Sequence, residues 1–183
     1  MKTRDNYRIV IDGYNLIFQC GLEGKRRDSL AIEKARQRAI QTISKWLGDD
    51  RKHAAIVFDA SRLPIKEDHS VSQIDGLTII YAVDYDDADS MIEEIVRTHS
   101  SPKQLIVVSS DHRLHKAALR RNAQPIDSDV WYDNLEQDFE SMDQIWGNRN
   151  PVQADSDSQL DLEKEASGLD KIDWFKEFGI QDE

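Results

Sequence analysis

Four apolar stretches of this chain each end in an aspartate, and these aspartates are the side chains best suited to chemistry. The stretches are residues 8–12, 55–59, 79–84 and 106–111, and each has the Ile- and Val-rich composition of a short buried strand. Parallel strands bring their carboxyl ends to one edge of a sheet, where α/β proteins bind their ligands. One aspartate in such a place is typical of a turn or a helix cap. Four in the same position indicate an acidic pocket.

The chemistry that fits this pocket is that of a hard divalent cation. The candidate ligands are Asp12, Asp59, Asp89 and Asp111, with neither cysteine nor histidine in the set. Carboxylate oxygens without sulfur or nitrogen ligands favour Mg²⁺ or Mn²⁺ over zinc. Such a site activates a water, orients a phosphodiester and stabilises the charge on the departing oxygen.

Polar and aromatic residues next to these aspartates extend the candidate site. Asn15 is suited to orient a ligand, a water or the scissile phosphate, and Ser109 and Ser110 can hydrogen-bond the metal shell or a phosphate. Tyr14 follows the first strand directly, so its ring has two interpretations. It either stacks on a base or packs beneath the loop.

Basic residues lie on the predicted loops that follow strand ends. Lys25, Arg26 and Arg62 are candidate phosphate contacts, with a solvated surface as the alternative. A second basic stripe, at residues 113–121, either binds RNA or faces water. The His112/His115 pair within the same segment is interpreted as solvated.

Strands and helices alternate along the chain, which predicts a mostly parallel α/β sheet. We expect further helices over 30–47, from about 86 to 96, over 111–119 and from 128 to about 146. The segments 18–28 and 60–76 are predicted to be loops, with a sharp turn at Gly13. Ser29 is the predicted cap of the first long helix.

The bulk composition limits the class of protein. The 183 residues suffice for one domain with a full core. No apolar run approaches the roughly 18–20 residues of a membrane span, and the charged N-terminus does not resemble a signal peptide. A lone cysteine, Cys20, is interpreted as an unreactive loop or core residue. These features predict a cytoplasmic protein with no membrane partner.

The acidity of the chain is concentrated near its C-terminus. The net charge is −11, and residues 147–183 carry ten acids and four bases. The remaining −5 on residues 1–146 is compatible with a metal-binding acid cluster. We therefore predict two parts: a folded domain over 1–146, and over 147–183 a flexible acidic linker with a short aromatic helix.

The order of these motifs resembles a known family. Asp-Gly-Tyr-Asn-Leu-Ile at 12–17, Val-Phe-Asp-Ala at 57–60, Asp-Ala-Asp-Ser-Met-Ile-Glu at 87–93 and Ser-Ser-Asp at 109–111 resemble the NYN domains, in particular the YacP-like branch. That branch lies within the PIN and flap-nuclease superfamily, and the resemblance covers residues 7–146. It implies a three-layer, Rossmann-like sheet and metal-dependent cleavage of RNA, coupled to translation in some members.

The resemblance also assigns roles to individual acids. It implies that Asp12, Asp89 and Asp111 are the core metal ligands and that Asp59 assists. Asp86, or its neighbour Asp87, matches a place where relatives carry an additional acid, which implies an outer ligand.

The prediction is a metal-dependent endoribonuclease that cleaves single-stranded RNA, with the ribosome as a second candidate partner. The alternative is an RNA-binding or ribosome-docking protein of the same fold with a weak or unused metal site. A receiver-type phosphotransfer domain is disfavoured because Ser109-Ser110-Asp111 occupies the late strand and no lysine follows a later strand in the place that such a domain requires. The sequence predicts neither the RNA target nor an oligomeric state.

Overall fold

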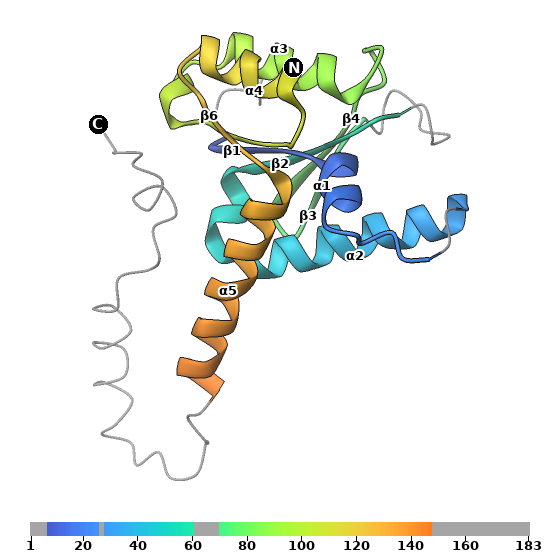
Figure 1. The fold of residues 1–183 in the computed structure, drawn as a ribbon, viewed down its shortest axis with the longest axis vertical. Helices are drawn as coiled ribbons and strands as arrows, with labels where there is room; N and C mark the ends of the chain where they lie inside the picture. The colour runs from blue at the N-terminus through green and yellow to red at the C-terminus, as the bar shows by residue number, and fades with distance from the viewer. Residues whose placement is uncertain (1–6, 26–27, 61–69, 148–183) are drawn as a thin grey trace. The chain divides into compact units, whose positions relative to one another are not determined.

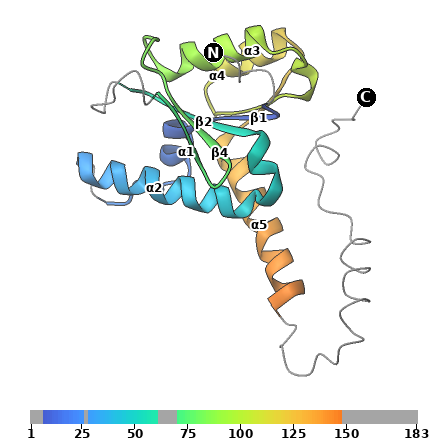
Figure 2. The same cartoon turned by 180° about the vertical axis from the view of Figure 1, so that it is seen from behind.

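The computed structural model describes residues 7–25, 28–60 and 70–147. Its six strands form one sheet in the order β3-β4-β2-β1-β5-β6. Helices α3 and α4 cover one face, while α1, α2 and the start of α5 cover the other (Figures 1 and 2). This is the predicted three-layer α/β/α architecture. Among the described residues, no helix is both long enough and apolar enough to cross a membrane.

Five of the six strands run parallel, and their ends define the edge that carries the site. They are β1 (Ile9–Asp12), β2 (Ala54–Phe58), β4 (Leu77–Tyr81), β5 (Ile106–Val108) and β6 (Gln124–Ile126). Every residue of β1 and β2 is buried, as expected for central strands covered on both faces. Pro125 lies in β6 at the sheet's edge, where a missing N–H donor is tolerated.

One face of the sheet packs against an apolar cluster from α3 (Ala88–Thr98) and α4 (His112–Arg120). From the strands, this cluster includes Val10, Val57 and Val107, and from α3 it includes Ile92 and Ile95, which are fully buried. Burying one such side chain stabilises the fold by about 1.5–3 kcal/mol. This packing fixes the starts of α3 and α4, and with them Asp89 and Asp111.

The helices differ from the prediction at their starts. A short helix, α1 (Gly13–Gln19), occupies part of the predicted loop. The long helix α2 (Ser29–Trp46) is capped by Asp28, whose carboxylate accepts a hydrogen bond from Ala31 N at 2.8 Å, so the predicted Ser29 cap was wrong by one residue. Two 3₁₀ segments, Gly48–His53 and Pro102–Gln104, precede β2 and β5.

A second difference is the strand β3 (Val71–Ile74), which lies in the predicted 60–76 loop and pairs antiparallel with β4. Its two-residue turn consists of Asp75 and Gly76, both with positive φ (51° and 92°). Asp-Gly is a favoured pair for this kind of hairpin turn. The Asp-Gly pair therefore indicated a hairpin in the sequence. The four residues of β3 gave no apolar pattern, because all of them are exposed.

Gly13 is required for a reason other than the predicted turn. It is the first residue of α1, and its φ is not positive. A Cβ at this position would lie 2.3–2.7 Å from three ring atoms of Phe58, closer than any packed side chain tolerates. The glycine thus allows α1 to start directly above β2.

The last helix, α5, spans Ser128–Gly147. The chain divides into two compact units, Met1–Leu135 and Glu136–Glu183, and the boundary between them lies within α5. The predicted tail helix and linker after residue 147 lie outside the described residues. All residues discussed below as the candidate site belong to the first unit.

Candidate active site at the carboxyl edge of the sheet

Asp12 is the centre of the candidate site. It ends β1 and caps α1: its Oδ1 accepts a hydrogen bond from Asn15 N at 3.1 Å, and its Oδ2 accepts one from Ser109 Oγ at 3.2 Å. Only 6% of the residue is exposed. Burial raises the pKa of Asp12 to about 6, and the charges of Asp89 and Asp111 act in the same direction. The carboxylate is therefore held in a place that disfavours its own charge.

Asp89 and Asp111 are brought to this edge by two neighbouring helices. Asp89 lies in the first turn of α3, whose cap is Asp87, and Asp111 caps α4 by accepting a hydrogen bond from Arg113 N at 2.6 Å. Burial raises the pKa of Asp89, and repulsion from Asp111 and Asp87 adds to the shift. Three of the predicted ligands thus lie within range of one another's charge.

Two further predicted ligands lie near this group. Asp59 follows β2 at the same edge of the sheet and is half-buried. Asp86 is exposed and precedes the cap of α3, so the adjacent Asp87 is the acid that acts on Asp89.

The carboxylates of Asp12, Asp89 and Asp111 are suitable ligands for a hard cation, but they do not surround a single metal position. Their oxygens are the ligands that Mg²⁺ and Mn²⁺ prefer, and a cation would relieve the repulsion at Asp12. In the described part of the chain, however, no three acidic, histidine or cysteine side chains are placed to hold one metal ion. Mg²⁺ usually keeps several waters and uses only one or two protein carboxylates. The group is thus compatible with a hydrated ion.

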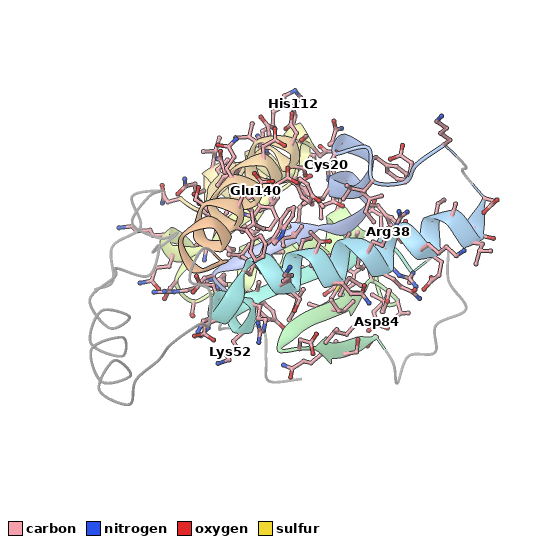
Figure 3. The ribbon with its side chains drawn as sticks, turned by 90° about the horizontal axis from the view of Figure 1, so that it is seen from below. Cys20, Arg38, Lys52, Asp84, His112 and Glu140 are labelled. Atoms are coloured by element: carbon pink, nitrogen blue, oxygen red, sulfur yellow. The ribbon has the colours of Figure 1, made fainter. Side chains whose placement is uncertain are left out.

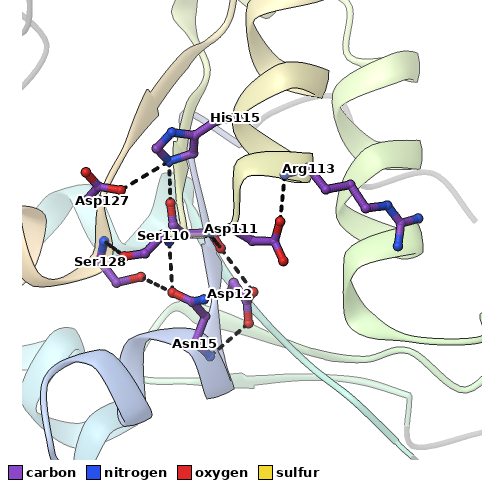
Figure 4. Close-up of polar contacts among 9 residues, drawn as sticks. Asp12, Asn15, Ser110, Asp111, Arg113, His115, Asp127 and Ser128 are labelled. Carbon is purple, nitrogen blue, oxygen red and sulfur yellow. Dashed lines mark hydrogen bonds and ion pairs between the residues drawn. The ribbon is translucent and has the colours of Figure 1, made fainter.

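A network of hydrogen bonds among neighbouring polar side chains and backbone groups holds Asp12 in place (Figure 4). Ser109 is fully buried, and its hydroxyl also accepts a hydrogen bond from Asp111 N at 3.2 Å. The side-chain carbonyl of Asn15 accepts hydrogen bonds from Ser110 N at 2.9 Å and from Ser128 Oγ at 2.8 Å, while Ser110 Oγ accepts one from Ser128 N. Ser109 and Ser110, predicted as substrate or metal-shell contacts, form these hydrogen bonds within the protein.

Asn15 retains a free group for a ligand. Its carbonyl oxygen is occupied by Ser110 and Ser128, but its Nδ2 donates no hydrogen bond to any described residue. The residue is half-buried. The amide can therefore hold the network together and still offer a donor at the edge of the site.

His115, Asp127 and Ser128 are supports that the sequence analysis missed. A ring nitrogen of His115 hydrogen-bonds the carbonyl of Ser109, and the same nitrogen lies 3.6 Å from Asp127 Oδ1. His115 is four residues from Asp111 on the helix that Asp111 caps, and this spacing was the available signal. The predicted solvated role is wrong for His115, whereas His112 is exposed as predicted.

The remaining predicted substrate contacts divide into three groups. Tyr14 is 8% exposed, and its ring packs against Phe18 and Phe58 with centroids 6.2 and 5.2 Å apart, so the packing interpretation applies. Lys25 is exposed. Arg26 and Arg62 lie outside the described residues.

A buried cation under the same edge was also missed. Arg36 of α2 is 7% exposed, is paired with Glu33, and lies over the rings of Phe58 and Tyr81 at 5.8 and 5.4 Å from their centroids. It thereby supports the ring that packs on Gly13. The Glu-x-x-Arg spacing indicated the ion pair, but nothing in the sequence indicated its burial.

The single cysteine takes no part in the site's chemistry. Burial raises the pKa of Cys20 to about 12, and the nearby charges of Asp129 and Asp133 add to the shift. A thiol with so high a pKa is unreactive at neutral pH, as predicted.

Comparison with known proteins places this geometry in a family. A search of curated proteins found no match. Two crystal structures of Rae1 (YacP) from Bacillus subtilis share the fold. One is 20% identical with a TM-score of 0.58 and covers 87% of this chain and 90% of that one. The other, a variant with one tryptophan replaced by leucine, is 19% identical with a TM-score of 0.54 and covers 88% and 85%.

The family model described as the YacP-like NYN domain matches residues 9–173. Since this match spans most of the sequence, the chain belongs to the YacP-like NYN domain family, a family of PIN-like nucleases.

Proposed function

We propose that this protein is a cytoplasmic, metal-dependent endoribonuclease that hydrolyses phosphodiesters of single-stranded RNA. The observation that carries the proposal is the buried Asp12 carboxylate, whose pKa is raised to about 6 by burial and by the neighbouring Asp89 and Asp111. Buried carboxylates held in mutual repulsion are typical of functional sites. Messenger RNA on the ribosome is the proposed target, in line with the translation coupling that the family resemblance implies.

Each residue has a role in this mechanism. Asp12, Asp89 and Asp111 would hold Mg²⁺ or Mn²⁺, which when bound supplies an activated water and neutralises charge on the phosphoryl group. Ser109 and Asn15 keep the Asp12 carboxylate in one orientation through the bonds described above. The free Nδ2 of Asn15 donates to a phosphate oxygen, and Lys25, Arg26 and Arg62 contact neighbouring phosphates.

One observation favours the alternative function, an RNA-binding or ribosome-docking protein with a weak metal site. No three potential ligands in the described part of the chain are placed around one point. A protein that binds RNA through the same edge without cleaving it would need no such closure.

Metal titration separates the two functions. Mn²⁺ and Mg²⁺ are titrated by calorimetry into the wild type and Asp89→Asn, and cleavage of an RNA with single-stranded regions is followed in parallel. Asp75→Asn is the matched control, because Asp75 is an exposed acid in the β3–β4 turn, before the start of β4 and thus away from the carboxyl edge. We expect Asp89→Asn to lose saturable binding and cleavage, and Asp75→Asn to keep both.

The other outcomes are equally informative. An Asp89→Asn variant that cut at the wild-type rate would refute the nuclease. Metal binding by the wild type without cleavage, even when ribosomes are added, would favour the alternative.

A further inference from the structure

The solvent side of α4 is basic in an acidic chain. Residues 112–121 contain four Lys and Arg residues and no acid, although the net charge of the chain is −11. By contrast, α5 contains six acids and no base. An RNA substrate explains this difference in charge only if the RNA contacts α4 and not α5.

Two of the four charges on α4 are already used inside the protein. Arg113 makes a bidentate pair with Glu93 of α3, with both N–O distances at 2.9 Å, and its Nη1 lies 3.6 Å from Asp87. Arg121 donates to the carbonyl of His99 at 3.3 Å. Both guanidinium groups therefore help to join α4 to α3.

Lys116 and Arg120 are different. Both are exposed, and neither forms an ion pair with another residue in the described ranges. They are four residues apart, so they lie on one side of the helix, and His112 one turn earlier continues that line. From His112 to Arg120 the line spans about 12 Å of helix at 1.5 Å per residue.

This line of side chains, the α4 stripe (His112, Lys116, Arg120), begins next to the acid group. Asp111 caps the helix immediately before His112. A polyanion whose reacting phosphate lies at Asp12 and Asp111 must continue away from those carboxylates. The α4 stripe offers it the positive charges of Lys116 and Arg120, which no acid in the described ranges pairs with.

We propose that the α4 stripe binds backbone phosphates of single-stranded RNA on one side of the scissile bond. The inference rests on the proposed function for the position of that bond. Lys116 and Arg120 neutralise one phosphate each, and His112 donates a hydrogen bond between them and the acid group. Contacts of this kind hold RNA without reading its sequence.

The test measures binding without cleavage. A fluorescein-labelled oligouridine is titrated with protein in EDTA, and anisotropy is recorded over a range of KCl concentrations. In the double variant Lys116→Glu/Arg120→Glu, we expect affinity to fall about tenfold or more at low salt. The slope of log affinity against log salt should fall by about 1.4, because each lost contact with a single strand removes about 0.7.

Arg38→Glu/Lys45→Glu is the matched control, since it changes the net charge by the same amount. Both residues are exposed on α2, which covers the other face of the sheet from α4 (Figure 1), and Arg38 lies away from His112 (Figure 3). We expect this control to keep most of the wild-type affinity and slope. Thermal unfolding of both variants checks that they are folded.

Three outcomes would overturn the proposal. They are an unchanged affinity in the α4 variant, an equal loss in the control, and no binding of the oligouridine by the wild type at low salt. The nuclease function is tested separately by adding Mn²⁺ to the wild-type complex. If the RNA remains intact while binding depends on Lys116 and Arg120, the nuclease fails and the α4 stripe stands.

Discussion

Each edge of the sheet buries an ionisable side chain. The side chain at one edge is repelled by its neighbours, and the side chain at the other forms hydrogen bonds with them. At the carboxyl edge, Asp12 is 6% exposed and is pushed towards its protonated form by burial and by two other acids. At the amino edge, His99 is 4% exposed, its Nε2 bonds the carbonyl of Tyr7 at 2.7 Å, and its Nδ1 accepts from Ser101 N at 3.1 Å. Both ring nitrogens of the histidine are satisfied.

His99 also lines a polar pocket of about 380 Å³ at the amino edge, together with Arg8 and His53. The two contacts are complementary when Nε2 donates to the Tyr7 carbonyl and Nδ1 accepts from the Ser101 N–H. The contrast shows where the fold is optimised for stability and where it tolerates repulsion. Residues that weaken a fold are expected at functional sites, so substitution of Asp12 and substitution of His99 should change stability in opposite directions.

The largest effect is expected at the amino edge. His99→Leu removes two hydrogen bonds and leaves a buried carbonyl and a backbone N–H without this partner, which should lower the free energy of unfolding by about 2–4 kcal/mol. Urea unfolding measures the change. If the variant were as stable as the wild type, the hydrogen bonds of His99 would not stabilise the amino edge.

Gly13→Ala tests whether the close contact between Gly13 and the Phe58 ring is needed at the carboxyl edge. A methyl group would overlap the ring of Phe58, so we expect a loss of about 1–3 kcal/mol. The loss should shrink in a Phe58→Leu background, because the smaller side chain makes room. A double-mutant cycle in urea gives the coupling, and fully additive effects would contradict the close contact.

Asp12→Asn should raise stability, in contrast to His99→Leu. Below the ordinary pKa of 3.8 the wild-type carboxyl is protonated in both folded and unfolded chains. Between that value and about 6 the folded state keeps a proton that the unfolded chain has lost, so stability falls as the pH rises, and above about 6 the whole penalty remains.

At pH 8, removing the buried charge should raise the free energy of unfolding by about 3 kcal/mol. Losing one hydrogen-bond acceptor should lower it by about 1 kcal/mol. The expected net gain for Asp12→Asn is therefore about 1–2 kcal/mol at pH 8 and none near pH 3. Thermal unfolding over this pH range measures it, with Mg²⁺ omitted. Added Mg²⁺ should stabilise the wild type and not the variant, and a gain that did not depend on pH would contradict the assignment.

The smallest effect is expected at Arg113. Its pair with Glu93 is about half exposed, so Arg113→Gln should lower stability by less than about 1 kcal/mol. The same change removes a positive charge that lowers the pKa of Asp89 and would repel a metal ion. We expect Mn²⁺ affinity to rise several-fold. Arg97→Gln, which breaks an exposed pair on α3, is the control and should leave the affinity unchanged.

Some features of this fold were readable from local sequence and others were missed for identifiable reasons. The long helices and buried strands follow from apolar periodicity that a short window contains. The helix α1 was missed because it is only seven residues long and begins with Asp-Gly, a pair more typical of turns. The edge strand β3 was missed because no buried face imposes alternation on it, although Asp75-Gly76 indicated a hairpin.

By itself, the sequence determined the parallel sheet, the aspartates at its carboxyl edge and the order of motifs that the family comparison confirmed. Those properties depend on residue type and on short spacings along the chain. Only the tertiary structure decided which acids meet at Asp12, that Ser109 and Asn15 bond within the protein, and that Tyr14 is buried. The reason is that these contacts join residues about 45–100 positions apart, from Tyr14 and Phe58 to Asp12 and Asp111, and the packing of helices on the sheet brings them together.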